Sequence, residues 1–342
     1  MTIICHLGNP KAYSTSIQTM LAASGQEQFQ YIGFRPSPDK ADWYLNPLIA
    51  ELLNFDLRYT TKFHFGQKCP EYQAYFRQLT QQAELENKDI WISSENLSMR
   101  AIMEEIDPQE KFARLQQVLP DGVTFVLIFR NIWASLRSLY SEFTKMGYSK
   151  SFAYFTDEAY LFRRANFLYS LLPGHLLAAL QQELTGTNRI AYHFLDNDPA
   201  VSGEKLHAFL SGLRPDTRLK PLKNINSSQE KSGTSESRAA SNSQAGSTLD
   251  SSGLIENHRA FWHLDREHQQ SLDRHIWGKL RQNKKNNQTA GQSAQAQEKL
   301  SCSARLTAFI QDIYPQDQAL LADGADSDYH NLWLDLSPLA VK

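Results

Sequence analysis

Short apolar runs alternate along the first two thirds of the chain with longer segments whose apolar residues recur at helical spacing. The apolar runs predict strands at residues 2–7, 29–33, 89–93, 123–129 and 189–194. The intervening segments predict helices at residues 14–25, 45–55, 71–86, 108–118, 133–146, 155–185 and 203–212, with a break near Pro173. Because residues 123–129 are almost all apolar, they are typical of a strand buried on both faces of a parallel sheet. The alternation therefore predicts an α/β fold in three layers, a parallel sheet with helices on both faces.

The last third of the chain has a different composition. Residues 226–253 and 283–299 are rich in small and polar residues, which bury too little apolar surface to offset the entropy lost on ordering. We therefore expect two mobile loops within a single domain that spans residues 1–342. Apolar residues between Trp262 and Leu280 recur at helical spacing and predict a helix docked on the core, and residues 303–313 predict a further short helix.

The overall composition narrows the class of protein. A hydrophobic fraction of 41% suffices for a core, and a net charge of −2 gives no electrostatic basis for nucleic-acid binding. Cys5, Cys69 and Cys302 are too few and too widely spaced for a disulfide framework or a metal pattern. No apolar run approaches the roughly 18–20 residues that cross a membrane, and no secretory signal precedes the first strand. We therefore expect a cytoplasmic protein with no membrane span and no nucleic-acid partner.

The first candidate for chemistry is the segment that joins the first strand to the first helix. There the chain reads Gly8-Asn9-Pro10-Lys11, and three hydroxyl residues follow where the helix begins. The N–H groups of a helix's first turn and the helix dipole attract a phosphate or sulfate group, and Lys11 adds a mobile positive charge. The lysine precedes the hydroxyls, so the segment does not have the Walker A spacing of ATP-binding loops. The candidate anion-binding residues are Gly8, Asn9, Pro10, Lys11, Ala12, Tyr13, Ser14, Thr15 and Ser16.

Two further candidate segments follow later strands. Arg130 comes directly after the apolar run 123–129, and Ser138 lies about two turns into the next helix. An arginine can hold a phosphate through two hydrogen bonds, and a serine hydroxyl can donate to the same group. Glu95 follows the strand at residues 89–93, at the end of the tripeptide Ser93-Ser94-Glu95. Each residue also has an ordinary structural interpretation: a strand-end ion pair for Arg130, a plain helical position for Ser138, and a cap of the next helix for Glu95.

Together these segments resemble those of sulfotransferases that use 3′-phosphoadenosine 5′-phosphosulfate (PAPS). The bacterial form of the phosphosulfate loop reads His-Ile-Gly-x-Pro-Lys-Thr-Gly-Thr-Thr-Ser, and the 3′-phosphate site commonly reads Arg-Asn-Pro, five residues, then Ser-x-Tyr. The matching residues are His6, Gly8, Pro10, Lys11, Thr15, Ser16, Arg130, Asn131, Ser138 and Tyr140. Tyr13 stands where the family usually has glycine, and Ile132 where it usually has proline. The resemblance covers roughly residues 2–228.

The resemblance implies a P-loop-like topology, with PAPS as the donor and no metal. Residues 8–16 would hold the 5′-phosphosulfate, and Arg130 and Ser138 the 3′-phosphate. Lys11 would stabilise the leaving phosphate and Glu95 would be the base, with His64, taken as a partly buried loop residue, as a rival. The acceptor would be a carbohydrate or glycoconjugate. Aromatic residues between positions 43 and 76 are candidates to contact it, although core packing explains them equally well.

Two other classes of protein remain open. A P-loop kinase or other phosphotransferase would need Mg²⁺ and ATP, which the spacing around Lys11 disfavours. A degenerate protein that binds a nucleotide or a partner without catalysis is favoured by Tyr13 and Ile132, since both depart from the family pattern. Glycine tolerates backbone conformations that tyrosine adopts poorly, so Tyr13 bears directly on the geometry of the loop.

Overall fold

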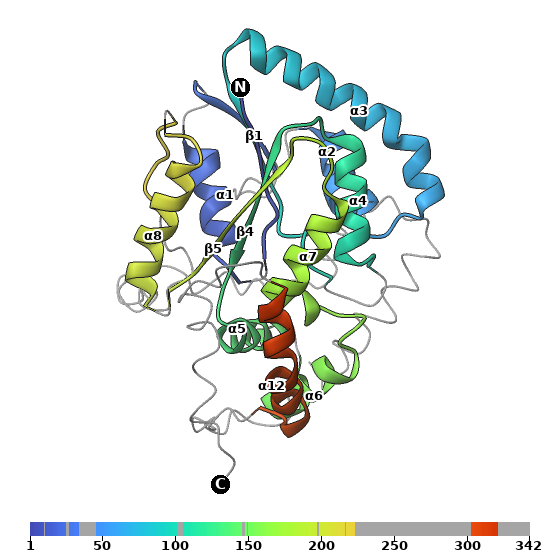
Figure 1. Cartoon of the computed structure of the whole chain (residues 1–342), viewed down its shortest axis with the longest axis vertical. Coiled ribbons are helices and arrows are strands. Elements are labelled where there is room, and N and C mark those ends of the chain that lie inside the picture. Colours follow the sequence, from blue (N-terminus) through green and yellow to red (C-terminus); the bar gives the residue numbers. More distant parts are fainter. Residues whose placement is uncertain are drawn as a thin grey trace, which may run out of the picture.

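The computed structural model describes residues 1–9, 11–24, 27–33, 46–100, 105–145, 148, 150–196, 198–215, 217–222 and 302–320. Its strands are β1 (Ile3–His6), β2 (Phe29–Gly33), β3 (Asp89–Ser93), β4 (Val123–Phe129) and β5 (Arg189–Phe194). They form one sheet in the order β2-β3-β1-β4-β5, and every neighbouring pair is parallel. The five predicted strands and the α/β class are therefore confirmed (Figure 1).

The sheet divides the core into two layers, because successive side chains of a strand point to opposite faces. Ile3 and Cys5 of β1 belong to the larger layer, whereas Ile4 belongs to the smaller one. β4 contributes buried side chains to both layers, for example Phe125 and Val126, as its continuous apolar run predicts.

Helices cover both faces of the sheet. The smaller layer is covered by α1 (Ser14–Ala23) and α8 (Pro199–Gly212). The larger layer is covered by α2 (Pro47–Glu51), α3 (Lys62–Leu85), α4 (Pro108–Val118) and α7 (Pro173–Glu183). Figure 1 shows α1 and α8 on one side of the strands and α3, α4 and α7 on the other.

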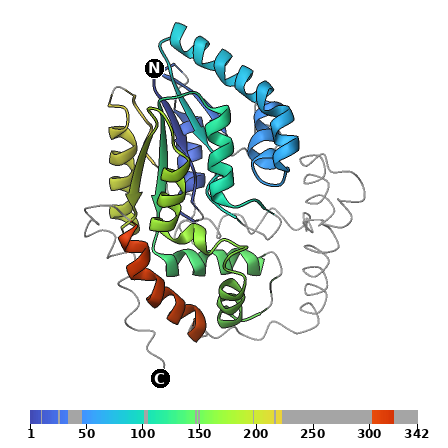
Figure 2. The ribbon, with the colours of Figure 1, turned by 45° about the vertical axis from the view of Figure 1, so that its right-hand side comes forward.

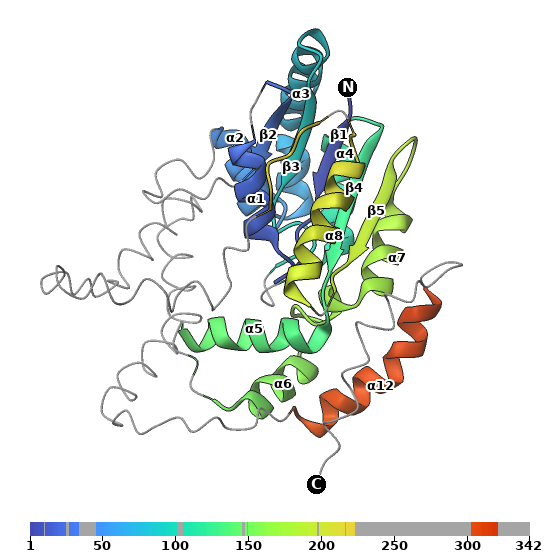
Figure 3. The ribbon, with the colours of Figure 1, turned by 90° about the vertical axis from the view of Figure 1, so that its left-hand side faces the viewer.

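Three helices lie beyond the carboxyl ends of the strands: α5 (Ile132–Lys145), α6 (Phe152–Leu161) and α12 (Ala304–Ala319). Figure 3 shows α5 running across the end of the sheet. Figure 2 shows α12 beside α6 and α7, both of which it contacts. The buried carboxylate of Asp317 in α12 accepts hydrogen bonds from the N–H groups of Gly174 (3.0 Å) and His175 (2.8 Å), and so caps the start of α7.

Several helices have bounds that differ from the prediction. α3 begins at Lys62 and not at residue 71, because Thr61 caps it and the helix continues through Pro70. The predicted helix at residues 45–55 is divided into α2 and a π-helix, Leu52–Asp56. The predicted segment 155–185 is interrupted over a longer stretch than expected near Pro173, because α6 ends at Leu161 and α7 begins at Pro173 after a short 3₁₀ helix, Tyr169–Leu171. α8 and α12 are both longer than predicted.

Other predictions fall on parts of the chain outside the described residues. They include the mobile loops at residues 226–253 and 283–299 and the helix expected between Trp262 and Leu280. A single domain over residues 1–342 stays a prediction. Among the described helices, none combines the length and the hydropathy needed to cross a lipid bilayer.

Candidate functional site

Three connections that follow neighbouring strands meet at the carboxyl edge of the sheet. The N-terminal loop (residues 8–16) follows β1, the Glu95 turn (residues 94–98) follows β3, and Arg130 follows β4. The strand order places β1 between β3 and β4, so the three connections are adjacent. In parallel sheets ligands bind outside these strand ends. The fold therefore gathers Lys11, Glu95 and Arg130 at the edge where a ligand is expected.

The N-terminal loop reaches α1 through two residues in the left-handed backbone region. Lys11 has a φ of 60° and Tyr13 a φ of 61°. This region costs a residue with a side chain about 1–2 kcal/mol, and glycine adopts it freely. Tyr13 thus takes the conformation for which glycine is best suited. The hydroxyl of Ser14 donates to the carbonyl of Asn9 (3.1 Å) and closes the loop.

The other positions of the N-terminal loop vary in exposure. Ala12, Ser14 and Ser16 are buried, and Thr15 is half-buried in the first turn of α1. Pro10 lies outside the described residues.

Gly8 brings the N-terminal loop against the Glu95 turn. A β-carbon on Gly8 would lie 2.5 Å from Cα of Glu95 and 3.0 Å from the carbonyl oxygen of Ser94, well inside contact distance. The hydroxyl of Ser98 also donates a hydrogen bond to the carbonyl of Gly8. The two backbones approach this closely because Gly8 has no side chain, and their approach fixes Glu95 beside the loop that carries Lys11.

The interpretation of Glu95 as a helix cap is wrong. Residues 95–98 form turns, and the next helix among the described residues, α4, begins at Pro108. Its cap is Asp107, whose carboxylate accepts a hydrogen bond from the N–H of Glu110 (3.0 Å). Glu95 is therefore free of any capping role in α4.

Glu95 belongs instead to a group of charges around Lys11. The ammonium of Lys11 forms an ion pair with Glu142 of α5. Burial raises the pKa of the Glu95 carboxyl, the positive charge of Lys11 lowers it, and the negative charge of Glu142 raises it. One lysine thus lies near two carboxylates from different segments, the turn after β3 and α5.

Arg130 joins the third connection to the first. Its Nη1 donates to the carbonyl oxygen of Lys11 at 3.2 Å, across 119 positions of sequence. Burial lowers the pKa of the Arg130 guanidinium, and the neighbouring Tyr13 raises it. Ser138 lies half-buried on α5, one turn before Glu142 and on the same face of the helix. Arg130 and α5 thus both contact Lys11, the first through its backbone and the second through its side chain.

Two other residues of the Arg130 segment have structural roles. Asn131 caps α5, because its Oδ1 accepts hydrogen bonds from the N–H groups of Trp133 (2.9 Å) and Ala134 (3.0 Å). The hydroxyl of Tyr140 donates to the carbonyl of Lys150 (2.9 Å), and its ring packs against aromatic side chains of α6. These structural contacts account for Asn131 and Tyr140 without any role at the candidate site.

The two histidines of interest have different surroundings. His6 is buried in β1 with its Nδ1 2.8 Å from the hydroxyl of Ser93, and burial lowers its pKa to about 4. His64 lies exposed in the first turn of α3, where it contacts Thr61 and Phe63. The expected loop position and partial burial of His64 are wrong, and its contacts do not include Lys11, Glu95 or Arg130. Within the described residues, no group of three or more His, Cys, Asp or Glu side chains is arranged to hold a metal ion.

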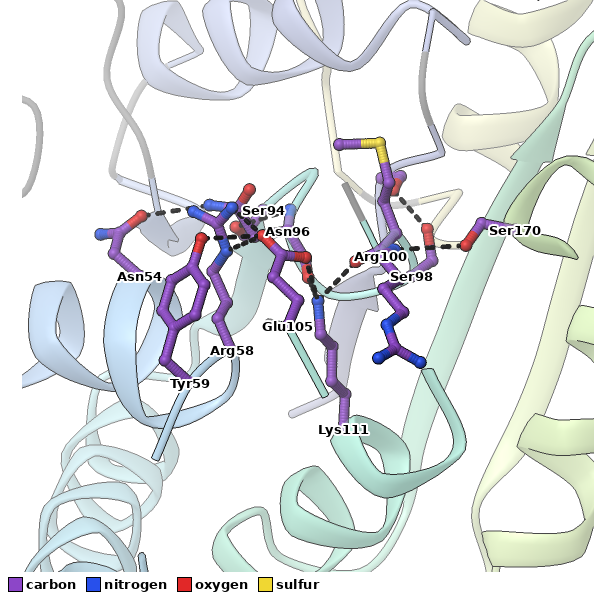
Figure 4. A network of polar contacts seen from close by, with 12 residues as sticks. Asn54, Arg58, Tyr59, Ser94, Asn96, Ser98, Arg100, Glu105, Lys111 and Ser170 are labelled. Carbon is purple, nitrogen blue, oxygen red and sulfur yellow. Dashed lines mark hydrogen bonds and ion pairs between the residues drawn. The ribbon is translucent and has the colours of Figure 1, made fainter. Parts of the chain in front are cut away.

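A buried lysine, Lys111, forms hydrogen bonds with the backbone of the Glu95 turn and of the residue after it. The ammonium of Lys111, which has no solvent exposure, donates to the carbonyls of Asn96 (2.8 Å) and Met99. It also forms an ion pair with Glu105 at 3.2 Å. Figure 4 shows the Lys111 side chain directed at these acceptors. Burial lowers the pKa of Lys111 to about 8, and the carboxylate of Glu105 opposes this shift.

Glu105 extends this network toward the π-helix. Its carboxylate accepts hydrogen bonds from Nε of Arg58 (2.7 Å) and from the hydroxyl of Tyr59 (2.9 Å) (Figure 4). A pocket of about 480 Å³ opens beside it, lined partly by the hydroxyls of Tyr59, Thr60 and Thr61. The pocket is polar and already contains paired charges, such as Glu110 with Lys62 and with Arg114.

The aromatic candidates between positions 43 and 76 divide into two groups. Phe65, Tyr72 and Phe76 are buried in the larger core layer, which explains their presence. Phe63 is 71% exposed and stands next to Lys62 at the pocket. Trp43 lies outside the described residues.

Sequence reasoning missed Glu142 and Lys111. A glutamate on a polar helix face is normally solvated, and the only signal for Glu142 was its position one turn after Ser138. A lysine is almost never fully buried, so nothing in the sequence marked Lys111 as an internal cation.

Comparison with known proteins leaves the family open. Neither the models of known protein families nor the curated protein sequences match this chain.

Proposed function

We propose that the chain is a sulfotransferase that moves the sulfuryl group of PAPS to a hydroxyl of a carbohydrate or glycoconjugate. The observation that carries the proposal is the hydrogen bond from Arg130 to the carbonyl of Lys11. It joins the two segments that would hold opposite ends of the donor. The central place of β1 in the strand order supports a P-loop-like topology, with the anion loop at the middle of the sheet edge.

The donor's two anionic groups suit different parts of the site. The first-turn N–H groups of α1, together with Lys11, would hold the 5′-phosphosulfate. The guanidinium of Arg130 and the hydroxyl of Ser138 would hold the 3′-phosphate, since an arginine can make two parallel hydrogen bonds to it. The adenosine 3′-phosphate is the feature that separates this donor from ATP.

The transfer step follows from the placement of Lys11 and Glu95. Glu95 takes the proton of the acceptor hydroxyl, whose oxygen then attacks the sulfur atom in line with the bridging oxygen. The new S–O bond forms as the bond to the 5′-phosphate breaks, and adenosine 3′,5′-bisphosphate leaves. Lys11 neutralises the charge that develops on the departing phosphate. The raised pKa of Glu95 suits this role, because a base is most effective when its pKa lies near the working pH.

The polar pocket beside Glu105 supports a polyhydroxylated acceptor. Its hydroxyls and paired charges offer hydrogen-bond donors and acceptors without a net charge to attract an ion. Lys111 ties the pocket wall at Glu105 to Asn96, the residue after Glu95. A sugar bound in the pocket would therefore lie near the segment that carries the base.

Removal of the Arg130 guanidinium tests the donor assignment. Arg130→Ala is expected to weaken binding of adenosine 3′,5′-bisphosphate by at least about tenfold, because the 3′-phosphate loses a charge-assisted bond. Binding of AMP, which lacks that phosphate, should change little. Calorimetric titration of both nucleotides measures the difference, with Arg77→Ala on the exposed face of α3 as the control. Equal losses for the two nucleotides would remove Arg130 from the 3′-phosphate site.

A further inference from the structure

The Lys11 ammonium, which the donor would need, is already paired with the carboxylate of Glu142. Lys11 follows β1 and Glu142 belongs to α5, so the pair joins two elements of the site. The backbone of Lys11 is meanwhile held by Arg130 through its carbonyl. The Lys11 side chain can therefore change its partner while the loop itself stays in place.

Exposure makes this pair easy to exchange. The Lys11 side chain is 20% exposed and that of Glu142 is 50% exposed. A pair this accessible to water adds little to stability, and the released carboxylate is readily hydrated. A phosphate or sulfate group offers the ammonium more acceptor oxygens and a higher charge than Glu142 does.

The neighbours of Lys11 favour such an exchange. Glu95 lies close enough for Lys11 to lower its pKa, so the Lys11 ammonium interacts with two carboxylates, Glu95 and Glu142. Ser138 stands one turn before Glu142 on α5. The anion that displaces Glu142 from Lys11 would be the donor's 5′-phosphosulfate, while its 3′-phosphate would lie at Ser138 on the same helix face.

We infer that Glu142 is an internal competitor of the donor, which pairs with Lys11 when no donor is bound and must be displaced by the donor's anionic group. This inference rests on the proposed function for the identity of that anion. Glu142 thereby lowers the affinity of the site for donor and product alike. After transfer, its return to Lys11 speeds release of the bisphosphate.

A charge-neutral variant tests the competition. Glu142→Gln is expected to lower the Kd for adenosine 3′,5′-bisphosphate roughly two- to fivefold, the range expected for an exposed ion pair. The same titrations use inorganic sulfate as a second probe, which carries no nucleoside and so tests the anion site without the PAPS assignment. Glu84→Gln on α3 removes an equal charge far from Lys11 in sequence and is the matched control. An unchanged denaturation midpoint for Glu142→Gln would show that the variant keeps its fold.

A Lys11→Met protein distinguishes competition for Lys11 from simple charge repulsion between Glu142 and the anion. In Lys11→Met protein, Glu142→Gln should no longer improve binding, because there is no ammonium to compete for. A gain that persists without Lys11 would overturn the inference, as would an unchanged Kd for both probes in the wild-type background.

The proposed function and this inference fail in different ways. Tighter sulfate binding by Glu142→Gln, with no bisphosphate binding by either protein, would support the competition and overturn the PAPS assignment. Bisphosphate binding with the same Kd in wild-type and Glu142→Gln protein would support the PAPS assignment and overturn the competition.

Discussion

Gly8 determines the geometry of the candidate site at the scale of single residues. The backbone of the Glu95 turn passes through the space that a β-carbon on Gly8 would fill. A glycine in a strand-to-helix loop is often read as a turn residue, but Gly8 is required for close packing of one backbone on another. Its substitution should therefore affect both folding and the position of Glu95.

Gly8→Ala is expected to lower the free energy of unfolding by about 1–3 kcal/mol, because the added methyl group meets rigid backbone. Gly66→Ala in α3 is the control, since a β-carbon there meets no heavy atom within 4 Å. That substitution should raise stability by up to about 1 kcal/mol through helix propensity. Urea denaturation of the three proteins measures both effects. A Gly8→Ala protein as stable as wild type would contradict the close approach.

Glu95→Gln separates binding from chemistry. The amide keeps the size of the side chain but cannot take a proton from the acceptor, so transfer from PAPS to a pool of carbohydrate acceptors should fall by at least about a hundredfold. The Kd for adenosine 3′,5′-bisphosphate should stay within about twofold of the wild-type value, because we do not place Glu95 among the residues that bind PAPS. Full activity in Glu95→Gln would show that another group is the base.

The sequence was sufficient to place Lys11, Glu95 and Arg130 at one edge of the sheet, because each follows an apolar strand and parallel strands share one carboxyl edge. It was insufficient for Glu142, since the ion pair with Lys11 depends on how α5 crosses the end of the sheet. His64 shows the opposite error. The predicted helix began only at residue 71, which left His64 in a loop, whereas α3 begins at Lys62 after its cap at Thr61.

At the scale of elements, the strands and the bounds of α4 were predicted correctly, whereas the start of α3 was not. A run of buried apolar residues identifies β4 without ambiguity, and all five strands match their predicted places. Helix ends depend instead on individual caps, such as Asp107 for α4 and Thr61 for α3. The cap of α7 could not be predicted locally, because it is supplied by Asp317 from α12, far along the chain.

The Asp317 cap gives α12 a measurable role. Asp317→Ala is expected to cost about 1–3 kcal/mol of stability, because two N–H groups at the start of α7 lose a buried charged acceptor. Hydrogen exchange should rise in the first turn of α7 and in α12. Asp312→Ala, at an exposed position of the same helix, should change stability by no more than about 0.5 kcal/mol. Equal effects of the two substitutions would show that Asp317 does not hold α12 in place.

At the scale of the whole molecule, the strand order turns three separate motifs into one site. Nothing in the sequence states that β1 lies between β3 and β4, yet this order is what brings the N-terminal loop, the Glu95 turn and Arg130 together. The buried network around Lys111 then holds the Glu95 turn in place (Figure 4). We propose that this edge binds a nucleotide with both a 3′- and a 5′-phosphate.

Calorimetric titration of the full chain with adenosine 3′,5′-bisphosphate, compared with ATP and Mg²⁺, tests that claim most directly. We expect the bisphosphate to bind without a metal and at least about tenfold more tightly than ATP with Mg²⁺. Preference for ATP with Mg²⁺ would contradict the account in favour of a phosphotransferase. Binding of neither nucleotide would contradict it in favour of a protein that has lost the donor site.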